Sequence, residues 1–123
     1  MLEIKISVAT AANLLVHRMR SEFDYRKRLG LFAEGYDLSN ISFKELMKIT
    51  ETAIFDLIIL LPAEIFMKEN NLALIIANAV RTLAKDLGRE EFVLYDINQA
   101  GAIVNSVRRL FVKSEKTKNF TNN

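Results

Sequence analysis

One stretch of the chain, residues 43–67, limits the available folds more than any other. Apolar residues recur every three or four positions over residues 43–61, and this spacing predicts a helix. In its second half, Phe55 and Ile59 occupy the face that is charged in the first half. A helix that is apolar on all sides must lie in the centre of the fold or be covered by a partner.

Pro62 follows this helix and should end or kink it, because proline lacks an amide donor and disfavours helical geometry at the preceding residue. We expect a further helical turn or two over residues 63–69. A second hint of helix pairing is Asn78, which stands between two alanines in the most apolar segment; a buried Asn can fix the register of paired helices. The candidates for a protein interface are Phe55, Ile59, Ile65, Phe66 and Asn78.

Three more segments, residues 11–29, 72–87 and 97–112, carry apolar stripes of helical period. Their ends bear the expected signals: Thr10 as an N-cap, Ser42 with Glu45 and Asp96 with Gln99 as capping boxes, and Gly30 and Gly88 as stops. Gly101 falls inside the last predicted helix. We interpret it as a point of close approach to another helix.

Two short segments predict strands. Residues 2–8 alternate apolar and polar side chains, and residues 91–95 form a short apolar run between charged residues. Pairing of these strands would join the two ends of the chain. The predicted fold is therefore mainly α (α+β in strict terms), a compact bundle of four to five helices with a small two-stranded β element made by the N-terminal strand and the late strand.

The 123 residues suit one domain. We expect a single globular helical domain at 1–113 and a flexible basic tail at 114–123, which lacks an apolar pattern. Cysteine is absent, which excludes disulfides and zinc–thiolate sites. Glu3 stands where a signal peptide carries basic residues, and no apolar run is long enough to span a bilayer. A cytoplasmic location is expected.

Catalytic constellations are missing from the sequence. There is one histidine, His17, and no metal-binding His pair, phosphate-binding glycine loop or nucleophile elbow can be written. Asp56 lies in the apolar half of the long predicted helix, so it should face out, pair with a cation such as Arg81, or cap a neighbouring helix. Of the functions considered, an enzyme that uses Asp56 in catalysis is the least favoured hypothesis. We expect no enzyme, no cofactor, no metal and no small-molecule ligand.

The net charge of +2 is unevenly spread. Residues 1–29 carry +3, residues 30–70 carry −4, residues 71–100 carry −1 and residues 101–123 carry +4. The basic ends could bind an anionic partner such as nucleic acid, or dock on the acidic middle of a second copy. The nucleic-acid-binding candidates are Arg20, Arg26, Lys27, Arg28, Arg108, Arg109 and Lys113.

Together these features favour a non-catalytic interaction protein: an assembly subunit, adaptor or inhibitor that binds a protein partner and self-associates into a homo-oligomer. The alternative is a small nucleic-acid-binding regulator that uses the basic N- and C-terminal helices. The compact, cysteine-free composition also suits a phage or mobile-element product.

Overall fold

The computed structural model describes the backbone of residues 7–60 and 71–121 and the side chains of residues 7–60 and 71–109. Over these ranges the chain forms helices and loops and no β-strand. The helices are α1 (Val8–Arg28), α2 (Phe43–Leu60), α4 (Asn71–Leu87), α5 (Glu90–Val93) and α6 (Ile97–Thr121). The predicted helical bundle is confirmed, and it is an all-α bundle over the part of the chain described.

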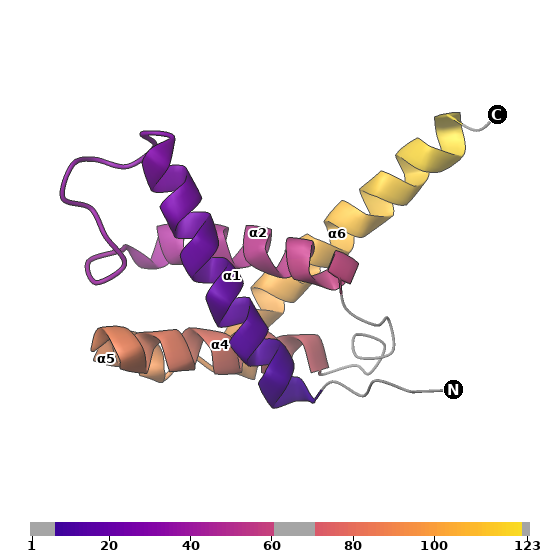
Figure 1. Ribbon diagram of the computed structural model, residues 1–123. Coiled ribbons are helices and arrows are strands. Elements are labelled where there is room, and N and C mark those ends of the chain that lie inside the picture. Colours follow the sequence, from indigo (N-terminus) through magenta and orange to yellow (C-terminus); the bar gives the residue numbers. More distant parts are fainter. Residues whose placement is uncertain (1–6, 61–70, 122–123) are drawn as a thin grey trace, which may run out of the picture.

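The helices stack in three layers (Figure 1). Helix α2 lies above α4 in this view, α1 crosses both in front, and α6 passes behind them. Both α1 and α6 pack against α4 and α2, whereas α2 and α4 meet each other only briefly. The short helix α5 packs on the C-terminal end of α4.

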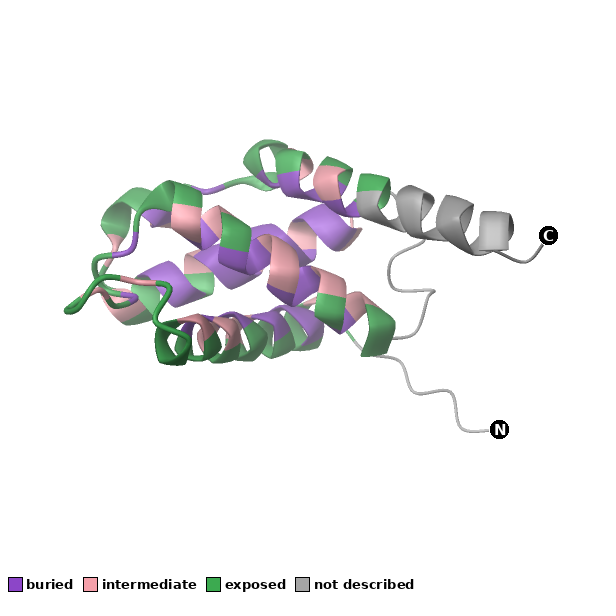
Figure 2. Cartoon of the chain, turned by 90° about the horizontal axis from the view of Figure 1, so that it is seen from above, coloured by how far each residue is buried: buried purple, intermediate pink, exposed green. Residues whose placement is uncertain are grey.

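Helix α4 carries the largest share of the core. Small and branched apolar residues occupy most of its circumference. The part of α4 that reaches water is a stripe formed by Asn78, Arg81, Thr82, Lys85 and Asp86. Figure 2 shows buried residues on the faces that the helices turn toward one another. The buried residues of α4 are Leu72, Ala73, Ile75, Ile76, Ala77, Ala79, Val80, Leu83 and Ala84.

The helix starts are fixed by side-chain caps. The Asp96–Gln99 capping box forms in full: Gln99 N–H donates to Asp96 Oδ1 (2.9 Å), and Asp96 N–H donates to Gln99 Oε1 (3.0 Å). At α2 only half the predicted box forms, because Glu45 N–H donates to Ser42 Oγ while Ser42 N–H donates to the Tyr36 hydroxyl.

The predicted cap of α1 at Thr10 is wrong. Ser7 is the N-cap, and its hydroxyl oxygen accepts from the Thr10 N–H at 3.1 Å. The helix therefore begins at Val8, inside the segment predicted as the first strand. Residues 2–6 of that segment lie outside the described residues, as do residues 63–69, for which a further helical turn was expected.

The late strand at 91–95 is also wrong, because this segment holds α5 and the turn after it. Phe92 and Tyr95, three residues apart, are both buried, while Leu94 is 83% exposed. An alternating strand would place Phe92 and Leu94 on the same face, so the spacing that decides burial is helical.

No β element therefore ties the basic ends of the chain together within the described residues. The end of α1 and the later half of α6 point to different sides of the bundle in Figure 1. Helix α6 continues to Thr121, so the backbone of most of the segment expected as a tail is helical. The division into a domain and a flexible tail stays a prediction. No helix, over the residues that could be searched, combines the length and apolar character needed to cross a membrane.

Gly101 does not mark a close helix contact. A Cβ added there would meet no atom within 4 Å, so the position inside α6 has room for a side chain. Gly88 is different, because its φ of +69° lies in the left-handed region that side chains with a Cβ avoid.

Two glycine substitutions should therefore change stability in opposite directions. Gly101→Ala should raise the free energy of unfolding by about 0.5–1 kcal/mol, because alanine is the better helix former and finds open space. Gly88→Ala should lower it by about 1–2 kcal/mol through left-handed strain. Urea denaturation of both variants is the measurement. A loss of stability in Gly101→Ala would mean that another helix does approach this position.

Candidate interaction surfaces

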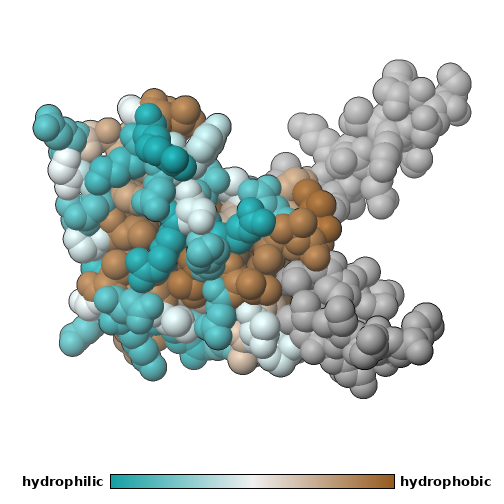
Figure 3. Space-filling model, viewed as in Figure 1, coloured by the Kyte–Doolittle hydropathy of each residue, from teal (hydrophilic) through white to brown (hydrophobic). Residues whose placement is uncertain are grey.

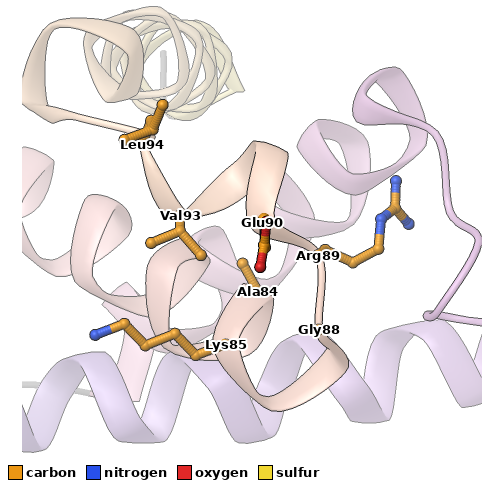
Figure 4. A pocket seen from close by; sticks show the side chains of 7 residues that line it. All are labelled: Ala84, Lys85, Gly88, Arg89, Glu90, Val93 and Leu94. Atoms are coloured by element: carbon orange, nitrogen blue, oxygen red, sulfur yellow. The ribbon is translucent and has the colours of Figure 1, made fainter.

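A hollow lies where α4 ends and the chain turns back into α5. Gly88 permits the turn: its N–H donates to Lys85 O and the next N–H, of Arg89, donates to Ala84 O at 2.8 Å, which closes the end of α4. The hollow has a volume of about 550 Å³. We name it the α5 hollow, and its lining, shown in Figure 4, is Ala84, Lys85, Gly88, Arg89, Glu90, Val93 and Leu94.

Arg89 holds this turn against the rest of the molecule. Its Nη1 donates to the carbonyl oxygen of Ser39 at 3.1 Å, across 50 residues of sequence, and its Nε pairs with Glu91 at 2.5 Å. The guanidinium also lies 4.5 Å from the centre of the Phe92 ring. The pKa of Glu91 is below its ordinary value, first because its own backbone N–H donates to the carboxylate and then because Arg89 does.

The α5 hollow is apolar at its base and charged at its edge. Val93 and the buried Ala84 supply the apolar part, whereas Lys85 and Glu90 are exposed. Figure 4 shows Leu94 and Lys85 on either side of Val93. Leu94 is 83% exposed, the highest value among the exposed large hydrophobic residues described. This surface was missed by sequence reasoning, because residues 91–95 were interpreted as a strand.

A second apolar surface is the C-terminal end of α2, which we name the α2 apolar end and define by Ile59 and Leu60. These side chains are 67% and 62% exposed. Figure 3 shows hydrophobic side chains gathered on this side of the bundle, where α2 ends. Phe55, one turn earlier, is half-buried and packs against the core. Ile65 and Phe66 lie outside the described residues.

The remaining interface candidate, Asn78, lies on the outer stripe of α4. It is half-buried, and its Oδ1 accepts from Nη2 of Arg81 on the same helix at 3.1 Å. Asp56 is exposed on α2. Of the arrangements expected for Asp56, the structure shows the one in which the residue faces out.

The basic candidates fall into paired and exposed residues. Arg20 pairs with Asp86 at 3.5 Å. Arg26 is the most engaged, because its Nε contacts Glu22 at 2.8 Å and its Nη2 donates to Thr52 Oγ1 at 3.0 Å. The exposed members are Lys27, Arg28, Arg108 and Arg109, and the side chain of Lys113 lies outside the described residues.

A shallower hollow of about 340 Å³ lies beside the end of α1, and it includes Asp24, Lys27 and Asp37. Its Asp37 carboxylate is already engaged within the chain. Ser39 donates to Asp37 through both its hydroxyl and its backbone N–H, which lowers the pKa of Asp37. No group of three or more acidic, His or Cys side chains suited to a metal ion occurs among the described residues.

Tyr95 contributes a buried polar atom beside α5. The residue is 2% exposed, and its hydroxyl oxygen has no hydrogen-bond partner among the described residues. Its ring packs near Phe43, with centroids 6.2 Å apart. Burial, reinforced by the neighbouring charge of Asp96, raises the pKa of Tyr95 to about 12. The buried hydroxyl lowers stability, since an unsatisfied polar group loses its hydration.

Replacing Tyr95 by Phe should leave the protein equally stable or more stable by about 1 kcal/mol at neutral pH, because the unsatisfied hydroxyl is removed. The folded-state pKa of about 12 lies above the ordinary value of 10.0. The stability linked to Tyr95 is therefore present below about pH 10 and is lost as the pH rises toward 12. Between about pH 10 and 12, the free energy of unfolding of Tyr95→Phe should therefore fall by about 1–3 kcal/mol less than that of the wild type.

Chemical denaturation at stepped pH measures both effects, because the two proteins differ only at residue 95. A variant that is clearly less stable at neutral pH would mean that the Tyr95 hydroxyl is hydrogen-bonded in solution. An identical alkaline loss in both proteins would also contradict the burial of this group.

Comparison with protein-family models, curated proteins and solved structures gives no significant match for this chain. What the protein does must therefore be inferred from its own surface. Over the described residues, that surface includes the α5 hollow, the α2 apolar end and basic side chains spread over α1 and α6.

Proposed function

We propose that this chain is a non-catalytic interaction protein. It self-associates, and it binds a separate protein partner through the α2 apolar end. The observation that carries the proposal is the exposure of Ile59 and Leu60, at 67% and 62%, beside a core that is closed without them. Adjacent large apolar side chains left in water are typical of protein contact sites.

The partner is expected to present an apolar surface. The last described turn of α2 carries no basic residue, so this turn has no cationic side chain that would favour phosphate. Aliphatic side chains at such a site gain affinity by leaving water, and flanking half-buried residues such as Phe55 and Ile58 provide a firm base against the core.

The nucleic-acid alternative has less support. Arg20 and Arg26 are held by Asp86, Glu22 and Thr52, so using them to bind phosphate would break contacts within the chain. The basic residues of α1 and α6 are also on separate elements that point to different sides of the bundle. A continuous backbone-tracking groove of the kind that single strands require is therefore not supported by this arrangement.

A photo-crosslinking residue placed at Ile59 tests the partner site in the cells where the chain is native. We expect a discrete protein adduct that is lost when Leu60→Ser is added, because that change removes the neighbouring apolar side chain. The matched control carries the crosslinker at Lys44, which is exposed at the other end of α2. Equal labelling from both positions, or no adduct from Ile59, would contradict a partner site here.

A salt titration separates the two functions. Fluorescence anisotropy with labelled single- and double-stranded DNA and RNA should show no binding at physiological salt. Any weak affinity at low salt should fall steeply as salt is added. Tight binding that survives physiological salt and is lost in Lys27→Ala with Arg28→Ala would instead establish the nucleic-acid alternative. Arg108→Ala with Arg109→Ala gives the same test for α6.

A further inference from the structure

We propose that the α5 hollow is the contact between two copies of this chain, with Leu94 of each copy entering the hollow of the other across a two-fold axis. This inference rests on the self-association in the proposed function and assigns its surface. It concerns the turn between α5 and α6, which is separate from the α2 apolar end.

The first support is the position of Leu94. Its side chain lines the edge of the hollow yet is 83% exposed, so it does not fill the space beside it. A leucine in this setting is an apolar projection next to an apolar recess. When one surface carries both a projecting leucine and a recess, two copies related by a two-fold axis each bury the leucine of the other.

The second support is the rigidity of the elements that hold Leu94. On one side, the backbone bonds around Gly88 and Arg89 close the end of α4. On the other, the reciprocal Asp96–Gln99 box fixes the first turn of α6. Because the turn is held at both ends, little conformational entropy is lost when Leu94 is buried by a second copy.

The third support is charge. Lys85 and Glu90 both line the hollow, and neither takes part in an ion pair within the described part of the chain. In the proposed dimer the two-fold axis passes between these residues, so that Lys85 of each copy faces Glu90 of the other. The edge of the surface is thus complementary to itself, which favours a closed dimer over an open chain of copies.

A protein other than a second copy would find less in this surface. A foreign apolar side chain could enter the recess, but it would leave Leu94 exposed unless it also supplied a matching recess. A second copy supplies the recess, the projecting leucine and both opposite charges at once. Binding of a different protein is therefore one outcome that the experiments on Leu94 must distinguish.

Sedimentation equilibrium of the full chain is the first measurement. The wild type should form dimers, and Leu94→Glu should weaken dimerisation by more than about tenfold, because it places a charge in the apolar recess. Leu31→Glu is the matched control, because Leu31 is also a loop leucine with 64% exposure. It should dimerise like the wild type. Circular dichroism confirms that each variant is folded.

Charge reversal then tests the two-fold axis itself. Lys85→Glu and Glu90→Lys should each weaken dimerisation when alone, because like charges then face each other. A mixture of the two single variants should form a heterodimer, and the double variant should recover the homodimer. A folding defect cannot produce this pattern, because both partners in the mixture keep their substitutions.

Several outcomes would overturn the inference. Dimers that persist in Leu94→Glu, or charge variants that are not rescued by mixing, would place the contact elsewhere while leaving self-association intact. A wild type that is monomeric at all concentrations would overturn both the inference and self-association, yet the crosslink from Ile59 would still test the partner site. A monomeric wild type with a protein adduct from a crosslinker at Leu94 would assign the hollow to a different partner.

Discussion

Burial of α4 is the constraint on which the rest of the structure depends. Nine of its residues are buried and a stripe along one side reaches water, so this helix cannot exist without neighbours on several sides. Helices α1 and α6 cover it from the front and back, and α5 closes its C-terminal end. Covering α4 also brings α1 and α6 onto α2, because both helices bridge the two. The three-layer arrangement follows from the burial of this one helix.

The way in which α4 ends determines which surface is left for binding. Gly88 adopts a left-handed conformation and returns the chain as a short helix, which buries Phe92 and Tyr95. One turn of helix cannot bury every apolar side chain it carries, so Leu94 is left in water. The α5 hollow is thus a consequence of the turn, and Arg89 stabilises it by joining the turn to the loop before α2. The bond from Arg89 to Ser39 restrains the turn before α5 and the loop before α2 relative to each other.

The long helices could be predicted from the sequence, because each has a strong apolar period and a recognisable cap or stop. The Asp96–Gln99 box and the glycine at 88 were identified correctly from residue type alone. The errors came from short segments. Residues 91–95 contain aromatic and branched residues that favour strands, and only the three-residue spacing of Phe92 and Tyr95, with two acidic residues at the start, pointed to a helical turn. In so short a segment, packing on α4 overrides local propensity.

The α5 hollow could not be foreseen, since it is formed by a segment whose secondary structure was predicted wrongly. For Ile59 the sequence left two alternatives, a place in the centre of the fold or cover by a partner, and the structure excludes the first by leaving Ile59 exposed.

Native-state hydrogen exchange, followed amide by amide, tests the central role of α4 most directly. The slowest amides should lie in the middle of α4 and should exchange only through global unfolding, with the same denaturant dependence as the whole protein. Amides of α1 and α6 that face away from α4 should open earlier. Exchange of the middle of α4 through local opening, while α1 and α6 stay protected, would contradict a bundle organised around α4.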